Sequence, residues 1–184
     1  MVSPSTTDLP IPKSWDEFEE LIWDLFKRKW EEISTERYGR SGQAQQGVDI
    51  YGQPKGVGGD YAGIQCKRYG IGGLTKTIIK REIRKAEDFE PKLALFIVAT
   101  TDKRNAKLQK EIRLINRERE EAEKFQIKIM FWEDLSNEIV AHNDILRKHY
   151  GGWREVFRGE ETEYKIPFMV ERLPENFAER PGPG

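Results

Sequence analysis

The sequence is poor in cysteine and histidine, with one Cys and two His among 184 residues. The single cysteine, Cys66, excludes both a disulfide within the chain and a zinc site made of four cysteines. No cysteine or acid joins His142 and His149 at the spacing of a zinc site, so we expect both histidines at the surface. We therefore expect neither a disulfide nor a structural zinc site to stabilise the fold.

Long apolar runs are also missing, since no stretch approaches the roughly 18 apolar residues of a membrane-spanning helix. The first twelve residues, MVSPSTTDLPIP, have neither the basic nor the apolar segment of a secretory signal. We therefore expect a soluble, cytoplasmic protein that does not associate with a membrane.

The chain lacks an overall excess of charge of one sign, because its formal net charge is −1 although 34% of its residues are charged. Charge is concentrated locally instead: residues 67–85 hold seven Lys or Arg and one Glu. A basic stripe on a nearly neutral protein is typical of a nucleic-acid site. The glycine-rich segments GVGGD and GIGG lack the Lys-Ser/Thr of a P-loop, which argues against nucleotide hydrolysis.

Hydrophobic periodicity predicts helices and strands in alternation. The predicted helices are residues 14–30, 74–89, 103–125 and 133–150, and the predicted strands are residues 31–39, 48–52, 61–69, 93–101 and 126–132. Ser14, with Glu17 three residues later, predicts a capping box at the first helix. The order favours an α/β fold with a mixed central sheet, antiparallel at first and then parallel through helical crossovers, flanked by helices.

The domain organisation follows from the same pattern. Residues 1–13 are rich in Ser, Thr and Pro and predict an extended or mobile lead-in, and residues 14–150 predict one domain. Residues 151–184 lose periodicity and end in Pro and Gly, which indicates a tail or a linker towards a further domain.

Three polar residues interrupt the two apolar strands that a Gly/Pro-rich loop at residues 53–60 connects. Asp49 lies on the first strand, and Gln65 and Lys67 lie on the second. Because side chains alternate between the faces of a strand, these three can gather on one face. Val48, Ile50, Ile64 and Cys66 are then expected on the opposite face as core, which makes Cys66 a buried apolar residue and not a nucleophile.

The polar trio has the chemistry of a hydrolytic metal site. The Asp49 carboxylate, the Gln65 amide oxygen and the backbone carbonyl of Cys66 are hard oxygen ligands that suit Mg²⁺. Lys67 beside the metal can orient or deprotonate water, or stabilise charge on a phosphate. The spacing is equally compatible with a partly buried ion pair between Asp49 and Lys67, with Gln65 as an edge residue.

The segments GVDI and IQCK resemble the PD-(D/E)xK nuclease signature in its D…QxK form. The chain from residue 14 to 135 is most similar to the Mrr-like branch of the restriction-endonuclease-like superfamily, whose core order is α-β-β-β-α-β. The predicted elements match this order, with an added α-β-α extension at the C-terminal side. GQAQQGVDIYG and GIQCKRY also resemble nuclease domains at the N-terminus of prokaryotic antiphage defence proteins.

The resemblance implies roles for individual residues. Asp49 would bind the metal, Gln65 would take the second acidic position and Lys67 would be the catalytic lysine. The family often adds a glutamate on the first helix, which implies Glu19, with Glu20 as the adjacent competitor and a solvated carboxylate as the plain alternative. The departure is Gln65, because a neutral amide removes one negative charge from the site and should weaken metal binding.

Contacts to nucleic acid are expected on both sides of the motif. Gln43, Gln45 and Gln46 precede the Asp49 strand, and Arg68 follows Lys67. On the next helix, Lys76, Lys80 and Arg84 recur every four residues and share one face, which can line phosphates or can be an ordinary solvated face.

The function that these observations favour is an endonuclease that depends on Mg²⁺, or on Mn²⁺ as a substitute, and cleaves double-stranded DNA. The resemblance implies a homodimer or higher homo-oligomer, and a role as the effector of a defence or restriction system. A non-catalytic nucleic-acid-binding module on the same fold is one alternative. Another is a protein-interaction domain that uses the charged helix from Lys103 to Lys124.

Overall fold

The computed structural model describes residues 9–30, 35–39, 46–54, 60–70 and 72–151. The chain divides into two units, Met1–His149 and Tyr150–Gly184, and every helix and strand below belongs to the first. None of the described helices has the length and apolar character needed to cross a bilayer. The domain boundaries expected from the sequence stay a prediction.

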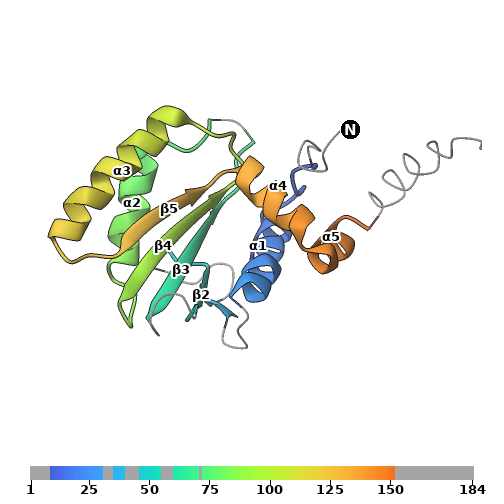
Figure 1. The fold of residues 1–184 in the computed structure, drawn as a ribbon, viewed down its shortest axis with the longest axis horizontal. Helices are drawn as coiled ribbons and strands as arrows, with labels where there is room; N and C mark the ends of the chain where they lie inside the picture. Colours follow the sequence, from blue (N-terminus) through green and yellow to red (C-terminus); the bar gives the residue numbers. More distant parts are fainter. Residues whose placement is uncertain (1–8, 31–34, 40–45, 55–59, 71, 152–184) are drawn as a thin grey trace, which may run out of the picture. The chain divides into compact units, whose positions relative to one another are not determined.

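The described chain alternates helices and strands around one mixed sheet (Figure 1). The elements are α1 (Trp15–Lys29), β1 (Glu36–Arg37), β2 (Ile50–Gly52), β3 (Tyr61–Lys67), α2 (Lys76–Ala86), β4 (Leu93–Thr100), α3 (Ala106–Glu121), β5 (Gln126–Met130), α4 (Trp132–Ala141) and α5 (Asn143–His149). The sheet order is β1-β2-β3-β4-β5, with antiparallel pairing from β1 to β3 and parallel pairing from β3 to β5. The predicted α/β fold class is confirmed, and the predicted element order is confirmed up to β5.

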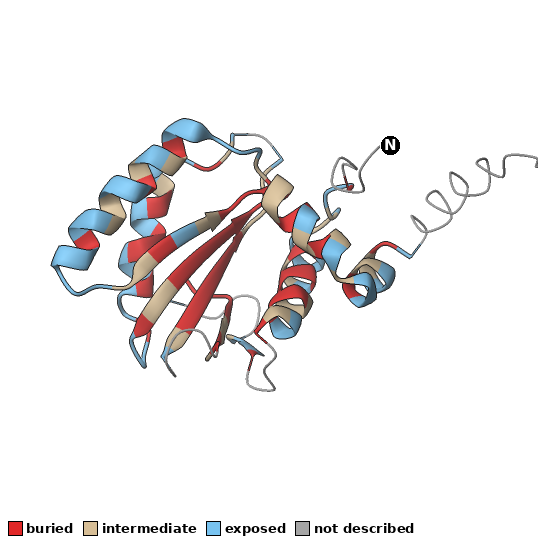
Figure 2. Cartoon of the chain, in the orientation of Figure 1, coloured by how far each residue is buried: buried red, intermediate tan, exposed pale blue. Residues whose placement is uncertain are grey.

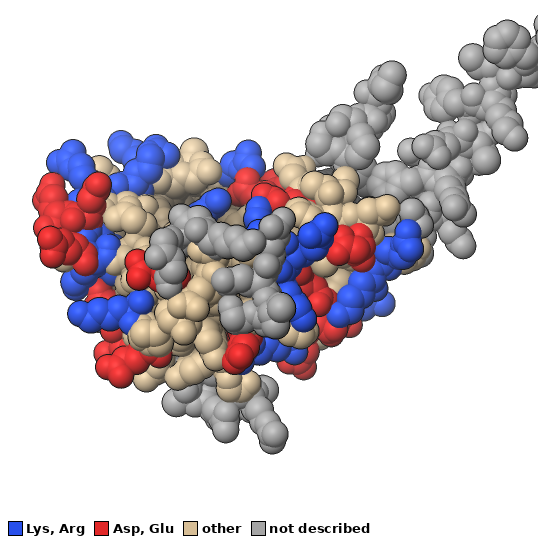
Figure 3. Space-filling model, turned by 60° about the horizontal axis from the view of Figure 1, so that its bottom comes forward, with Lys and Arg blue, Asp and Glu red and all other residues tan. Residues whose placement is uncertain are grey.

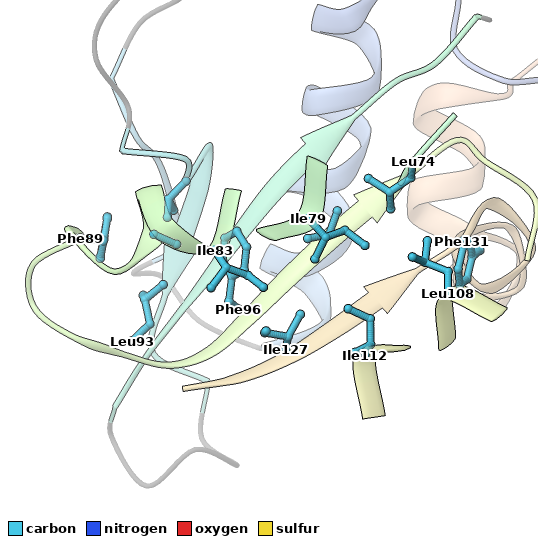
Figure 4. Close-up of a cluster of buried hydrophobic side chains, with 13 residues drawn as sticks. Leu74, Ile79, Ile83, Phe89, Leu93, Phe96, Leu108, Ile112, Ile127 and Phe131 are labelled. Atoms are coloured by element: carbon cyan, nitrogen blue, oxygen red, sulfur yellow. The ribbon is translucent and has the colours of Figure 1, made fainter. Parts of the chain in front are cut away.

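Helices cover both faces of the sheet, with α2 and α3 on one side and α1 and α4 on the other (Figure 1). The core on the first side contains Ile79 and Ile83 from α2, Phe96 from β4, and Leu108 and Ile112 from α3 (Figure 4). The central strands are largely buried, while the outer helix faces are exposed (Figure 2). Burial on both faces explains why the β4 sequence is continuously apolar.

The start of α1 differs in detail from the predicted capping box. The Ser14 hydroxyl accepts a hydrogen bond from the Glu17 backbone N–H at 3.1 Å, as expected of an N-cap. The Glu17 carboxylate accepts from the backbone N–H of Lys13 at 2.8 Å, where a capping box would use Ser14. The Glu17 side chain therefore fastens the residue before the cap.

The C-terminal helical region is two helices where the sequence predicted one. His142 lies between α4 and α5 with φ −112° and ψ 93°, which is incompatible with a continuous helix. Trp132, predicted at the end of a strand, is the first residue of α4 because the Asp134 carboxylate accepts from the backbone N–H of Phe131. The indole N–H of Trp132 donates to the carbonyl of Leu9, so this part of the predicted lead-in packs on the domain.

Candidate active site

The pairing of β2 with β3 places the polar residues opposite one another. Ile50 pairs with Ile64, and the Asp49 backbone N–H donates to the Ile64 carbonyl at 2.8 Å, directly before β2 begins. On the other side of β3, Gln65 lies beside Val98 of β4, whose side chain belongs to the core under α2 and α3. Gln65 therefore faces that side of the sheet, as does Lys67 two residues later.

The expected position of Val48 on the opposite face is wrong. Val48 belongs to the core under α2 and α3. Its two methyl groups pack against Gly63 of β3, where an added Cβ would lie 3.2 Å from each of them. Gln46 and Gly47 have positive φ values of 46° and 70°, so the chain turns just before Val48 and is not an extended strand there. Strict alternation begins only at Asp49.

The remaining apolar residues of the two strands lie where the alternation predicted. Ile50, Ile64 and Cys66 are fully buried outside the core under α2 and α3. Burial raises the pKa of the Cys66 thiol well above its usual value, and the nearby carboxylates of Asp49 and Glu19 add to the shift. The Cys66 thiol is therefore an inert core group, and only the backbone of Cys66, through its N–H and its carbonyl, takes part in the site.

Asp49 and Gln65 meet in a compact buried contact, and each is 4% exposed. The Asp49 Oδ2 atom accepts from Gln65 Nε2 at 2.5 Å and from the Cys66 backbone N–H at 2.7 Å. Gln65 Nε2 also donates to the Cys66 carbonyl at 3.3 Å. A carboxylate, a carboxamide and a main-chain carbonyl therefore converge at the point where β3 approaches its end.

The surroundings of Asp49 make its carboxyl hold a proton more tightly than it would in water. Burial raises the pKa of its carboxyl to about 7, and the negative charges of Glu19 and Glu82 act in the same direction. The hydrogen bond from the Cys66 N–H and the positive charge of Lys67 oppose the rise without cancelling it. A perturbed carboxyl of this kind is a recognised mark of a functional site.

Lys67 is held by a carboxylate that the sequence analysis did not include. Its Nζ atom lies 3.5 Å from Glu82 Oε1 on α2, and its side chain is 15% exposed. The ammonium also lies 5.9 Å from the ring centroid of Trp15, at the start of α1. Glu82 falls on the buried face of α2 with Ile79 and Ile83, and an acid at an apolar helix position is the signal that would have revealed it.

The two glutamates considered on α1 lie in different environments. Glu19 Oε1 is 3.8 Å from Arg37 Nε, and the Glu19 side chain is 20% exposed. Burial raises the pKa of Glu19, Arg37 opposes the rise and Asp16 adds to it. Glu20 pairs with Lys148 of α5 at 3.2 Å and is 48% exposed. Of these two α1 glutamates, Glu19 is the one whose charge raises the pKa of Asp49.

The polar segment before β2 is only partly described, and Gln43 and Gln45 lie outside the described residues. The side-chain oxygen of Gln46 accepts a hydrogen bond from the Tyr38 hydroxyl at 3.3 Å. After β3, Arg68 Nε donates to the carbonyl of Pro12 at 2.7 Å, which ties the end of the strand to the segment before α1.

The basic face expected on α2 points to the outside of the molecule. Lys76, Lys80 and Arg84 are all exposed. Lys76 forms an ion pair with Glu111 of α3. Lys80 and Arg84 each lie two residues from Glu82, whose carboxylate contacts Lys67. Each therefore points about 160° away from that carboxylate around the helix axis. The helix geometry thus turns Lys80 and Arg84 away from the polar trio, while Lys76 is paired with α3.

The donor set of the trio fits a divalent cation without a cluster of acids. Among the described residues, no group of three or more His, Cys, Asp and Glu side chains is arranged to hold a metal ion. The Gln65 nitrogen, however, contacts both Asp49 Oδ2 and the Cys66 carbonyl, which are two oxygens that would hold a cation. Hard oxygens of these kinds suit Mg²⁺, and the oxygen of the Gln65 carboxamide can join them.

The raised pKa of Asp49 predicts a specific pH dependence of stability in the presence of a chelator. The unfolded carboxyl ionises near 3.8 and the folded one near 7. The native state therefore binds the proton more tightly, and stability falls as pH rises through this window. Urea unfolding should show that the free energy of unfolding of Asp49→Asn, relative to the wild type, increases by up to about 1.4 kcal/mol per pH unit below pH 7. Above pH 7 the difference between the two proteins should stay constant.

Glu87 provides the control for this measurement. Burial favours its protonated form, but hydrogen bonds from Arg119 and Lys124 outweigh burial and lower its pKa. The stability that ionised Glu87 contributes is thus present above its unfolded pKa of 4.5 and lost only in acid. From about pH 6 to pH 7, where Asp49→Asn should still gain on the wild type, the free energy of unfolding of Glu87→Gln should run parallel to that of the wild type. Parallel curves for Asp49→Asn as well would contradict the burial argument.

A mixed sheet with a buried Asp and a Gln-x-Lys strand agrees with the class of restriction-endonuclease-like nuclease domains. A family model described as restriction endonuclease, Mrr_cat, matches residues 13–119, which is more than half of the chain. The chain belongs to this family, and Asp49, Gln65 and Lys67 lie within the matched region. No curated protein and no solved structure gives a significant match.

Proposed function

We propose that the chain is a metal-dependent endonuclease domain that hydrolyses phosphodiester bonds of double-stranded DNA. The observation that carries the proposal is the buried contact of Asp49 with Gln65 at 2.5 Å, on the strand that ends in Lys67. Family membership supports nuclease activity, and the contact supports Asp49 and Gln65 as residues of its active site. Asp49, Gln65 and the Cys66 carbonyl would hold Mg²⁺, or Mn²⁺ in its place, with Glu19 assisting.

The residues of the chain divide the work. A bound Mg²⁺ would supply Lewis-acid stabilisation of the phosphate and a more acidic water. A bound cation would keep Asp49 ionised, so that Asp49 supplies the negative charge among Asp49, Gln65 and the Cys66 carbonyl, and its burial strengthens every electrostatic interaction made there. Lys67 places an ammonium at the end of β3, where it orients the attacking water and stabilises negative charge developing on the phosphate. Glu82 keeps that ammonium in position from the adjacent helix.

The wider assignment rests on the family and on the chemistry of the substrate. Two active sites can cut both strands of a duplex in one encounter, which supports a homodimer or a higher homo-oligomer. We place the protein in the cytoplasm as the effector of a restriction or defence system. Gln43, Gln45, Gln46 and Arg68 remain proposed contacts to the nucleic-acid backbone.

One observation favours a second candidate, a non-catalytic DNA-binding module. The Gln65 amide already donates a hydrogen bond to the buried Asp49 carboxylate, so this carboxylate has a polar partner without a cation. A domain that kept this hydrogen bond permanently would bind DNA without cutting it.

Metal removal tests the proposed function directly. Supercoiled plasmid incubated with the chain and Mg²⁺ should become nicked and then linear, because hydrolysis depends on a cation at Asp49 and Gln65. Excess EDTA should stop the reaction, and renewed Mg²⁺ or Mn²⁺ should restore it. Binding of duplex DNA without cleavage in either metal would support the binding module and reject the nuclease.

A further inference from the structure

Glu82 is the centre of an unusual group of charges next to the proposed nuclease site. Its carboxylate is 1% exposed, yet it contacts three cations. Arg81 Nη2 lies 3.0 Å and Lys67 Nζ 3.5 Å from Oε1, and Lys85 Nζ lies 3.4 Å from Oε2. One buried negative charge therefore contacts three positive charges, and the group of Glu82, Lys67, Arg81 and Lys85 has a net charge of +2.

The three cations differ in their exposure to solvent. The side chains of Arg81 and Lys85 are 61% and 50% exposed, whereas that of Lys67 is 15% exposed. Burial alone would raise the pKa of Glu82, but Lys67, Arg81 and Lys85 outweigh it and lower that pKa. The carboxylate therefore stays ionised and anchors two outward-facing cations beside the catalytic lysine.

Helix geometry places Arg81 and Lys85 on the same flank of α2. They lie one residue before and three residues after Glu82, so about 40° separates them around the helix axis. The core residues Ile79 and Ile83 lie on the other flank. The exposed cations of this flank are therefore next to Glu82 and Lys67, and not on the outer face of the helix.

The loop before Asp49 packs directly on this part of α2. A Cβ at Gly47 would lie 2.7 Å from Lys85 Cβ and 3.2 Å from the Glu82 carbonyl oxygen. Gly47 also has a φ of 70°, so glycine meets both the space and the backbone requirement there. The close approach brings the Asp49 strand and the charge group of α2 into one surface.

The overall charge pattern does not by itself direct a polyanion to the site. Figure 3 shows Lys, Arg, Asp and Glu side chains interspersed over one face of the molecule, with no single basic field. Recognition of DNA must then depend on a local arrangement of cations. Guanidinium and ammonium groups that are exposed but anchored are well suited to phosphate oxygens, because anchoring reduces the entropy lost on binding.

We propose that Arg81 and Lys85, held by Glu82 as a positioning residue, bind the phosphodiester backbone of the substrate next to the scissile bond. The assignment rests on the proposed function and replaces the outer face of α2, Lys80 and Arg84, as the main phosphate contact. Glu82 orients Arg81 and Lys85 for binding and Lys67 for the reaction. The ligand is the sugar-phosphate backbone, and the contact carries no base specificity.

Salt dependence of DNA binding tests the contact independently of cleavage. The full 184-residue chain is titrated against a fluorescent DNA duplex in EDTA at several salt concentrations. Arg81→Gln with Lys85→Gln should weaken binding and lower the slope of log Kd against log salt by about 1.8, at about 0.9 per phosphate contact. Lys80→Gln with Arg84→Gln removes the same charge from the same helix and should leave the slope unchanged.

Each outcome of the titration has one meaning. Equal losses in both double variants would show a general charge effect and overturn the assignment, as would an unchanged slope for Arg81→Gln with Lys85→Gln. Failure of the wild type to bind duplex DNA would reject this contact together with the proposed function. Binding with the expected slopes but no cleavage in Mg²⁺ would keep the contact and reject only the nuclease.

Glu82→Gln separates positioning from simple charge. The net charge rises by one because a negative charge is lost, and this gain should offset the lost anchoring of Arg81 and Lys85, so duplex affinity should stay near the wild-type value. The cleavage rate at saturating DNA should fall at least about 10-fold because Lys67 loses its anchor. Thermal unfolding identifies the fraction of folded protein. A folded Glu82→Gln protein that cleaves at the wild-type rate would overturn the positioning role.

Discussion

Lys67→Ala should reduce plasmid cleavage by at least about 100-fold, the usual scale for losing one catalytic proton-transfer or charge-stabilising group. Lys67 is the cation at the end of β3, directly after the Gln65 and Cys66 donors. In the proposed mechanism, loss of this ammonium leaves both the attacking water and the charge developing on the phosphate without a partner at the end of β3. Its loss also removes a positive charge that lowers the pKa of Asp49, so the carboxylate becomes less available.

The fold should survive this substitution. Glu82 keeps Arg81 and Lys85 as partners, so no buried carboxylate is left uncompensated. Duplex binding in EDTA and the thermal unfolding midpoint should therefore stay near the wild-type values. Lys80→Ala is the matched control, because it removes the same charge from the outer face of α2 and should cleave normally. Cleavage by Lys67→Ala at the wild-type rate would eliminate the proposed site.

Gln65→Glu should make the protein less stable in EDTA and more responsive to Mg²⁺. The new carboxylate would replace a nitrogen that donates to Asp49 Oδ2 at 2.5 Å, so a favourable contact becomes a repulsive one. Two carboxylates at that distance cannot both ionise without a cation, and a destabilisation of about 1–3 kcal/mol is expected. A divalent cation relieves the repulsion, so thermal unfolding should show a larger Mg²⁺-induced rise than in the wild type.

Gln65→Met separates the lost hydrogen bond from the added charge. It has a similar volume and no donor or acceptor oxygen, so the EDTA stability should fall but Mg²⁺ should not restore it. This comparison measures metal binding without requiring cleavage. The idea that Asp49, Gln65 and the Cys66 carbonyl share a cation would be refuted by an identical Mg²⁺ response in all three proteins.

Local patterns predicted most elements of the fold. The apolar stripe of α1 and the continuous apolar run of β4 are strong periodic signals, and both elements lie where they were expected. The break at His142 was not predictable in the same way, because the apolar positions continue across it. The helix ends there through backbone geometry that no residue pattern announced.

Strand alternation was also sufficient to relate Gln65 to Lys67 and to bury Cys66, because both follow from the two-residue period of a strand. It failed for Val48, since two positive φ values turn the chain just before Asp49. The contact of Asp49 with Gln65 additionally requires a pairing register. The hydrophobic pattern of Ile50 and Ile64 constrains that register, and the structure realises it.

The sequence by itself determined the order of helices and strands, the fold class and the two-strand position of Asp49, Gln65 and Lys67, because these depend on local periodicity and spacing. Only the tertiary structure decided which carboxylate holds Lys67 and which cations of α2 lie beside the site. Glu82 meets Lys67 across a gap of 15 positions, through the packing of α2 on the sheet. Long-range contacts of this kind depend on how a helix rotates on its core, and no local pattern in the chain records that rotation.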